Sequence, residues 1–380
     1  MKIAIMTQPL GKNYGGIMQA YALQKVLKDM GHSPITIDYQ TKEGGFIYKK
    51  VRLAYRLAKK ATGKRQAPIN LESKIGYLTK HNQEFINANI VQSKYINESK
   101  KLKKHFKKNS YDAVIVGSDQ TWRPKYSPNI YDFYLDFISK DKGIKRIAYA
   151  SSFGVDDWEY SVEETKKCSK LAKLFDAISV REQSGVDLCK EYLGVDSELV
   201  LDPTLLLEKE DYLALIGDRY KADKSEGVFT YFLDKNEDKK KAAEYIANEL
   251  GSRVYSCQAK HSLGDLNSNK LEDYKMPAVQ DWLASFANAE FILTDSFHGM
   301  VFSIVFEKPF LVIVNKERGA ARFLSLLAQL KMLNHIAYSS SSIVDVYNKN
   351  RVDGFYFNRK AQLLDMKVQS KDFLINNIRK

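Results

Sequence analysis

Short apolar runs alternate with segments of helical periodicity along most of the chain. In the first 40 residues, the apolar run KIAIMT is followed by the glycine-rich GKNYGG, by residues 17–31 with apolar positions three and four apart, and by the β-rich SPITIDY. This order predicts a strand, a turn, a helix and a second strand, which together form a βαβ unit with parallel strands. Gly31 stands where such a helix would end.

The same alternation continues in two series. The first contains the strand candidates YDAVIVGSD, KRIAYASSF, DAISVRE and SELVLDP, and the second contains GVFTYFL, SRVYSC, AEFILTDSF and PFLVIV. Segments of helix length separate most of them, among them residues 162–174, 184–193 and 239–250, and helices that begin near residues 277 and 299. Strands that are apolar throughout are typical of parallel sheets covered on both faces. The pattern therefore predicts an α/β protein with two doubly wound, Rossmann-like domains.

A chain of 380 residues has the length of two ordinary domains. We expect an N-terminal domain over residues 1–205 with a basic insertion at about 47–110, a C-terminal domain over 206–340, and a tail over 341–380. Apolar positions among many charges in residues 360–378 predict a terminal amphipathic helix, which could cross back to the first domain.

The formal charge of +13 is concentrated in the insertion. Residues Ile47 to Ser110 carry 17 Lys or Arg and three Glu, a local charge of +14, so the remainder is near −1. No helix-turn-helix, finger or aromatic stacking motif accompanies this charge, and we expect no nucleic-acid partner. Within the insertion, an apolar stripe lies beside lysines and arginines; it comprises Val51, Ala54, Leu57, Ala58 and Ala61. The stripe predicts either a solvated surface helix or a peripheral contact with anionic lipid.

The sequence contains no motif for a metal site, a dinucleotide-binding loop or a P-loop. The three cysteines, Cys168, Cys189 and Cys257, form no Cys-x-x-Cys pair, and the six histidines form no His-x-His or His-Glu-x-x-His, so no metal is expected. The loop GKNYGG matches neither the dinucleotide-binding spacing nor a P-loop. No apolar run reaches about 18 residues, and we expect a cytoplasmic protein, with peripheral association at the inner face of the membrane as an option.

Polar residues at predicted strand ends are the candidates for chemistry, because ligands of open α/β sheets bind at the carboxyl ends of the strands. In TDSFHGM, His298 could exchange a proton near neutral pH, and the start of the following helix would present N–H groups to an anion. A purely structural histidine is the alternative. Arg318 and Arg322 lie four residues apart after the next strand, where they could bind phosphate or carboxylate or pair with acidic neighbours.

The first domain has three polar strand ends: Gly117 to Trp122, Ser151 to Gly154, and Ser179 to Glu182. Asp119, Gln120 and Trp122 form a plausible sugar-binding set, since carboxylates accept hydroxyl protons and indole packs on C–H faces. Singly, Asp119 could be a helix cap and Trp122 a core residue.

These motifs together resemble the polysaccharide pyruvyl transferase family. The resemblance runs through NYGGIMQAYAL, VGSDQTW, YASSFG, ISVRE, LDPTLLL, TDSFHGMVFSIVFEKPF and ERGAARF, and so covers most of residues 1–335. It implies a fold similar to GT-B glycosyltransferases, with acceptor on the first domain and donor on the second. It also implies phosphoenolpyruvate as co-substrate, no cofactor, and a cyclic pyruvate ketal on a sugar or lipid-linked oligosaccharide of a bacterial surface polysaccharide.

The resemblance assigns roles by position. His298 and Asp119 would be catalytic; Arg181, Ser296, Arg318 and Arg322 would bind the donor; and the acceptor would contact Asn13, Tyr14, Ser118, Gln120, Trp122 and Ser152. The family often has Arg where this chain has Ser296, so the three arginines are candidates to replace that anion ligand. Two alternatives follow from this departure: a GT-B-type glycosyltransferase that uses a sugar nucleotide, and a non-catalytic glycan-binding protein.

Overall fold

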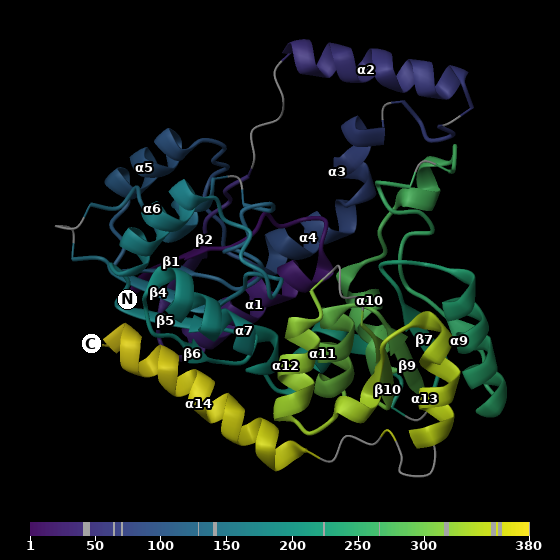
Figure 1. The fold of residues 1–380 in the computed structure, drawn as a ribbon. Coiled ribbons are helices and arrows are strands. Elements are labelled where there is room, and N and C mark those ends of the chain that lie inside the picture. Colours follow the sequence, from purple (N-terminus) through teal and green to yellow (C-terminus); the bar gives the residue numbers. More distant parts are fainter. Residues whose placement is uncertain are drawn as a thin grey trace.

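The computed structural model describes most of the chain. It covers residues 1–40, 46–63, 65–69, 71–127, 129–139, 143–222, 225–265, 267–314, 319–350, 355 and 359–379, without the side chains of 46–49, 52 and 72. Two parallel sheets lie side by side, each flanked by helices (Figure 1).

The first sheet has six strands in the order β2-β1-β3-β4-β5-β6. These are β2 (Ser33–Thr36), β1 (Lys2–Met6), β3 (Ala113–Val116), β4 (Lys145–Ser151), β5 (Ala177–Val180) and β6 (Glu198–Leu199). Alternate residues of β1 enter different cores: Ile3 and Ile5 face one side of the sheet, and Ala4 and Met6 face the other. Both faces are covered, which is why central strands such as β1 and β3 read as apolar runs.

The second sheet has five strands in the order β11-β10-β9-β7-β8. These are β11 (Ile336–Ala337), β10 (Phe310–Ile313), β9 (Phe291–Thr294), β7 (Val228–Tyr231) and β8 (Val254–Tyr255). Taken in chain order, its strands repeat the 2-1-3-4-5 arrangement of the first sheet. The prediction of two doubly wound α/β domains is confirmed.

Helices pack on both faces of the sheets, as their shared cores show. The helices of the described residues are α1 (Tyr14–Asp29), α2 (Phe46–Ala61), α3 (Ile75–Leu78), α4 (Lys80–Asn89), α5 (Ser99–Lys108), α6 (Val162–Ala172), α7 (Gln183–Leu188), α8 (Lys209–Ile216), α9 (Glu237–Glu249), α10 (Val279–Ala287), α11 (Phe297–Val305), α12 (Ala321–Gln329), α13 (Ile343–Asn350) and α14 (Lys360–Arg379). Of these, α2 and α3 contribute no residue to the cores shared with the sheets. Within the described residues, no helix is both long and apolar enough to cross a bilayer.

Helices α1 and α11 begin earlier than the sequence predicts, and so does α9, which starts at Glu237 instead of residue 239. Helix α1 starts at Tyr14 instead of residue 17, because the Asn13 side chain accepts a hydrogen bond from the Gly15 N–H and so caps a first turn that contains two glycines. Helix α11 starts at Phe297 instead of Gly299, because Ser296 caps it by accepting from the Gly299 N–H. Consequently Gly15 and His298 both lie in first helical turns.

Strand β11 and helix α13 have no counterpart in the sequence prediction. Strand β11 contains only two residues, too few for a pattern of alternation to be recognised.

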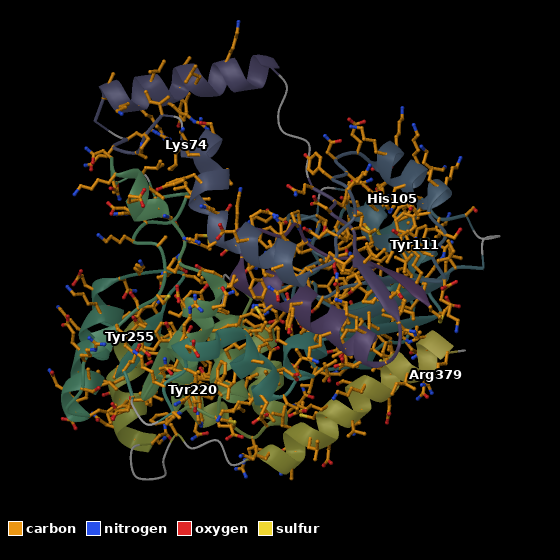
Figure 2. All side chains as sticks on the ribbon, turned by 180° about the vertical axis from the view of Figure 1, so that it is seen from behind. Lys74, His105, Tyr111, Tyr220, Tyr255 and Arg379 are labelled. Carbon is orange, nitrogen blue, oxygen red and sulfur yellow. The ribbon has the colours of Figure 1, made fainter. Side chains whose placement is uncertain are left out.

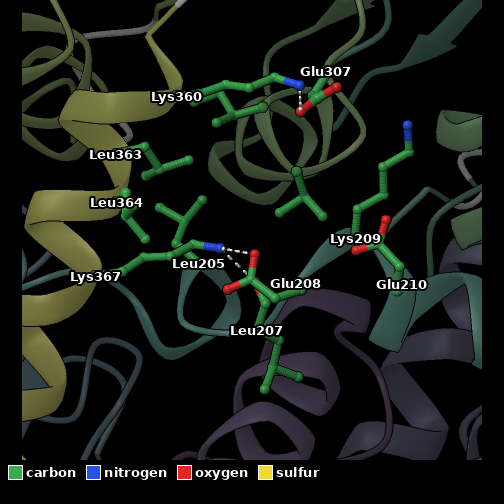
Figure 3. A pocket seen from close by; sticks show the side chains of 12 residues that line it. Leu205, Leu207, Glu208, Lys209, Glu210, Glu307, Lys360, Leu363, Leu364 and Lys367 are labelled. Atoms are coloured by element: carbon green, nitrogen blue, oxygen red, sulfur yellow. Dashed lines mark hydrogen bonds and ion pairs between the residues drawn. The ribbon is translucent and has the colours of Figure 1, made fainter.

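The C-terminal helix α14 crosses back to the first domain, as the sequence allows (Figure 1). The Ser370 hydroxyl accepts a hydrogen bond from the Leu201 N–H, and Phe373 packs against Tyr149. Near its start, Lys367 pairs with Glu208 at 2.8 Å and Lys360 pairs with Glu307 at 2.7 Å (Figure 3). These contacts line a cavity of about 330 Å³ between α14 and the segments that carry Glu208 and Glu307.

Candidate functional site

In each sheet, strand order reverses beside the first strand of the domain. These switch points lie between β1 and β3 in the first sheet and between β7 and β9 in the second. At each switch point, hydrogen bonds connect the two loops that follow its strands. In the first sheet, the Thr7 hydroxyl donates to the Ser118 carbonyl at 3.0 Å. In the second, the Asp295 carboxylate accepts from the Leu233 and Asp234 N–H groups. Ligands of doubly wound sheets bind at switch points, and here each domain contributes one.

The edges of the two domains touch each other. Tyr14 at the start of α1 stacks on Trp282 of α10 with ring centroids 4.9 Å apart, and its hydroxyl donates to the Pro277 carbonyl at 2.7 Å. Elsewhere along the interface a Cβ on Gly319 would lie 1.8 Å from the Gly154 carbonyl oxygen. Only glycine allows that approach of the two backbones.

His298 lies at this interface, in the first turn of α11. Its side chain is buried, and its imidazole packs directly on Gly15 of α1: a Cβ at Gly15 would lie 2.0 Å from His298 Nδ1. On the other side of the ring, Nε2 is 3.9 Å from Asp202 Oδ2 and makes no hydrogen bond to a described residue. The histidine is thus held between the N-terminus of α1 and a carboxylate that follows β6.

Arg181, which follows β5, is surrounded by three carboxylates. Its Nη1 donates to Asp202 Oδ2 at 2.8 Å, its Nη2 to Asp119 Oδ1 at 3.4 Å, and its Nε lies 3.8 Å from Glu182 Oε2. Burial works against the charged guanidinium, but the three carboxylates outweigh it and raise the pKa of Arg181. A buried cation of this kind is stable because its partners are in place.

Arg322, in the first turn of α12, is a second buried guanidinium beside Phe297. Its guanidinium carbon is 5.5 Å from the centroid of the Phe297 ring, and that of Arg181 is 5.0 Å from the same centroid. Burial and then the proximity of Arg181 lower the pKa of Arg322 to about 10, so it remains a cation at neutral pH. Arg318 lies outside the described residues.

The environment of His298 favours its neutral form. Burial lowers its pKa to about 4 and outweighs the opposing attraction of Asp202. Asp202 is itself buried, but His298 and Arg181 outweigh that burial and hold the pKa of its carboxyl below the ordinary value. At neutral pH the site therefore contains a neutral imidazole beside an ionised carboxylate.

The predicted acceptor residues are not equivalent. Trp122 is wrong as an acceptor contact: its indole is fully buried, stacks on Tyr134 and donates to the Phe133 carbonyl. The first domain uses it as a core residue, the alternative that the sequence left open. Gln120 is half-buried and accepts a hydrogen bond from Arg123, and Asn13 is an exposed helix cap.

Ser118 and Ser152 are buried within the first domain. The Ser118 hydroxyl accepts from Gln19 Nε2, and Ser152 Oγ accepts from the Gly154 N–H. Asp119 is better placed: its backbone has φ of 75°, and its Oδ2 lies 3.5 Å from the position that a Cβ on Gly16 would take. Asp119 thus reaches the start of α1, close to the glycine that supports His298. The contacts of these residues with an acceptor stay predictions.

Sequence reasoning assigned no role to three members of the cluster. Asp202 binds Arg181, Thr204 and the Gln19 amide, yet in LDPTLLL it reads as an ordinary turn or cap before proline. Glu182 accepts from the Phe153 N–H at 2.9 Å and stands beside Arg181. Gly15 carries no functional group at all. The position of LDPT at the end of the predicted strand SELVLDP was the available signal for Asp202.

A second cavity, of about 500 Å³, opens beside Tyr14. It is lined by Lys12 and Tyr14 of the first domain and mostly by the segments that follow β7 and β8, including Lys235, His261, Tyr274 and Met276. Among the described residues, no group of three or more His, Cys, Asp or Glu is arranged to hold a metal ion.

Comparison with known proteins adds a family and a fold. The family described as polysaccharide pyruvyl transferase matches residues 13–317. No curated protein sequence matches the chain.

Solved structures with a similar fold include three that cover nearly the whole chain. UDP-GlcNAc 2-epimerase from Neisseria meningitidis, bound to UDP-GlcNAc, is 9% identical with a TM-score of 0.54, and 99% of each chain is covered. The S. aureus MnaA–UDP co-structure is 14% identical with a TM-score of 0.52, covering 100% of this chain and 98% of that one. UDP-N-acetylglucosamine 2-epimerase from Rickettsia bellii is 12% identical with a TM-score of 0.50, covering 100% and 97%. These likenesses establish the two-domain GT-B fold.

Proposed function

The chain belongs to the polysaccharide pyruvyl transferase family, and we propose that it transfers pyruvate from phosphoenolpyruvate to two hydroxyls of a sugar, forming a cyclic ketal and releasing phosphate. The observation that carries this proposal is the position of His298, buried against Gly15 with Asp202 and Arg181 behind it and Arg322 beside Phe297. An acid–base group and a cation thus meet where the two domains touch.

Helix N-termini at the interface favour an anionic donor. Helices α1 and α11 have no acidic residue in their first turns, whereas α9, which follows β7 at the other side of the second switch point, begins with Glu237 and Asp238. The partial positive charge of a helix N-terminus attracts phosphate, and carboxylates in the first turn oppose that attraction. We therefore place phosphoenolpyruvate near His298 and Arg322 and away from α9.

Donor binding would prepare His298 for catalysis. In the empty site its imidazole is neutral at pH 7, because its pKa is about 4. The phosphate and carboxylate of phosphoenolpyruvate would stabilise the imidazolium and raise that pKa, so binding would bring a proton to the histidine. Asp202, 3.9 Å from Nε2, would orient the ring.

The reaction then needs one proton donated and two removed. His298 gives its proton to the methylene carbon, and the resulting oxocarbenium-like carbon is attacked by the first sugar hydroxyl, whose proton passes to a base. Asp119, which reaches the start of α1, is our candidate for that base. The second hydroxyl attacks the same carbon as the phosphate leaves, and its proton leaves with the phosphate.

Ser296 bears on the identity of the donor ligand. Its hydroxyl caps α11 and accepts from the Gly299 N–H at 3.3 Å, so this position supports the helix that carries His298. Arg181 is already balanced by three carboxylates. Among the predicted donor ligands, we assign Arg322 to the donor, because it lies in the first turn of α12 with its guanidinium carbon 5.5 Å from the ring centroid of Phe297, which precedes His298.

Calorimetric titration of phosphoenolpyruvate would test this assignment. Arg322→Ala should weaken binding by about 2–5 kcal/mol, the cost of truncating one partner of a buried charge pair. Arg219→Ala is the matched control, because Arg219 is a half-exposed arginine of the same domain paired with Asp281, and it should leave affinity unchanged. Equal affinity in wild type and Arg322→Ala would contradict the assignment.

The second candidate is a glycosyltransferase that uses a sugar nucleotide. The 500 Å³ cavity favours it, because it lies at the carboxyl edge of the second sheet beside Tyr14. Phosphate release from phosphoenolpyruvate in the presence of lipid-linked sugars, compared with nucleotide release from sugar nucleotides, distinguishes the two. Binding of a glycan without either release would support a non-catalytic role.

A further inference from the structure

Helix α2 stands away from both sheets, beyond the segment that contains Lys74 (Figure 2). None of its described side chains, from Lys50 to Ala61, is buried. Four large apolar residues are among the most exposed of the protein: Val51 is 63% exposed, Tyr55 59%, Leu57 49% and Leu53 45%. A helix that left these groups in water would forgo most of the stabilisation that amphipathic helices gain from packing.

Most basic residues of α2 lie on the side opposite its large apolar residues. At 100° per residue, Leu53, Leu57, Ala54, Val51 and Tyr55 span roughly half of the helix circumference. Arg56, Lys59 and Lys60 lie in the remainder, whereas Lys50, near the start of the helix, lies within the apolar half. The helix contains six Lys or Arg and no Asp or Glu. An exposed apolar face with a basic flank is typical of helices that lie in the interface of a bilayer.

Helix α5 shows that basicity alone does not produce this arrangement. It also carries six lysines, but its two large apolar residues, Leu102 and Phe106, are buried in the core of the first domain. Its lysines therefore belong to an ordinary solvated face. Of these two helices, α2 alone leaves its large apolar residues exposed.

The segment after α2 connects it to the larger cavity. Ala67, Leu71 and Leu78 pack with Tyr274 of the second domain, and the Met276 N–H donates to the Leu78 carbonyl at 2.9 Å. Tyr274 and Met276 also line the 500 Å³ cavity. The segment that follows α2 therefore packs against residues that line this cavity. Lys74, in the same segment, lies between α2 and the second domain (Figure 2).

We propose that α2 docks on a bilayer containing anionic phospholipid, with its axis along the surface and its apolar residues among the acyl chains. Charge complementarity selects this occupant, because lysines and arginines flank the apolar face and no carboxylate interrupts it. A second copy of the chain would bring two such cationic helices together, which their repulsion opposes. Docking would also bring the cavity beside Tyr274 close to a membrane-held acceptor. The existence of such an acceptor rests on the proposed function, whereas the docking of α2 does not.

Vesicle sedimentation tests the proposal with the full-length protein. Wild type should sediment with phosphatidylcholine vesicles that contain about one-third phosphatidylglycerol and stay in solution with phosphatidylcholine alone. Leu53→Ser with Leu57→Ser should lower the partition coefficient by about tenfold or more, since two apolar side chains that would be buried among the acyl chains are lost. Lys59→Gln with Lys60→Gln should weaken binding by about tenfold and reduce its salt dependence.

The matched control is Lys103→Gln with Lys104→Gln in α5, which removes the same charge from a helix whose apolar residues are buried. This variant should bind within about twofold of wild type. The proposal is overturned if wild type does not bind anionic vesicles, or if the α5 variant loses as much binding as the α2 variants. It is also overturned if the serine variant keeps full binding, which would indicate adsorption by general charge.

Thermal unfolding and phosphate release with a water-soluble sugar separate this proposal from the proposed function. None of the substituted residues is buried, so both readouts should match wild type. Membrane binding without turnover would leave docking standing and count against pyruvyl transfer. Turnover without membrane binding would support pyruvyl transfer and contradict the docking of α2.

Discussion

The contact between Gly15 and His298 makes a sharp prediction, because glycine is required there only by a neighbouring ring. Gly15 lies in the first turn of α1, where alanine suits the helix and would by itself stabilise it by about 0.5–1 kcal/mol. An alanine Cβ, however, would lie 2.0 Å from His298 Nδ1, whereas ordinary contact begins at 3.4 Å. The imidazole must therefore retreat by about 1.4 Å, the difference between these distances.

Such a shift should be costly for catalysis. A displacement of about 1 Å in a reacting group can lower the rate by about 100-fold, and a positioned acid–base group contributes about 100- to 10,000-fold. We expect Gly15→Ala to lower phosphate release from phosphoenolpyruvate by about 100-fold while the protein stays folded. The assay is steady-state phosphate release, with the thermal unfolding midpoint measured on the same sample.

Gly16→Ala is the matched control. It lies next to Gly15 in the same turn, but the atom nearest its added Cβ is Asp119 Oδ2 at 3.5 Å, an ordinary contact. It should retain activity within a few-fold. Adding Gly15→Ala to His298→Ala should cause no further loss, because the displaced group is already absent. Equal activities of Gly15→Ala and Gly16→Ala, or independent losses in the double variant, would refute the reasoning.

Three further predictions follow from buried polar groups. Asp202→Asn should lower the free energy of unfolding by about 3–5 kcal/mol, because it leaves the buried Arg181 short of a carboxylate; an unchanged urea midpoint would contradict this. His298 and His335 both have a pKa of about 4 caused by burial, so the native state binds fewer protons than the unfolded state between pH 4 and about 6.5. The free energy of unfolding should therefore be constant above pH 6.5 and fall by about 1.4 kcal/mol per histidine for each pH unit below it. In urea titrations at several pH values, His335→Gln should remove the part of this decrease that His335 causes. Tyr14→Phe should cost about 1–3 kcal/mol by leaving the Pro277 carbonyl unpaired between the domains, which the thermal midpoint would register; a midpoint equal to wild type would count against that contact.

Much of the fold could be predicted because its signals are local. Each buried strand is a continuous apolar run, and each long helix has apolar positions three and four apart, so both can be recognised within about ten residues. The parallel order follows from alternation of strands and helices. Elements too short to show a period, such as β11, escaped this reasoning, and helix starts moved where Asn13 and Ser296 cap turns that read as loops.

The candidate site could also be predicted in part. The sequence indicates that His298, Asp119 and Arg181 follow strands, and strand ends of a parallel sheet meet at one edge, so their convergence could be expected. It could not decide which neighbouring polar or aromatic residue points into the core. Trp122 follows the same strand as Asp119, yet Tyr134 and Phe133, more than ten residues away, enclose it.

The sequence by itself determined two doubly wound domains and the turns that carry the polar residues, because local apolar period and strand-end chemistry are written in consecutive residues. Only the tertiary structure decided that Asp202 faces His298 and that Gly15 makes room for its ring, since each pairing joins residues of different elements or domains. The same holds for α2 and α5, two basic amphipathic helices of similar sequence character. Packing buried the apolar residues of α5 and left those of α2 exposed, and no pattern within either helix distinguishes the two outcomes.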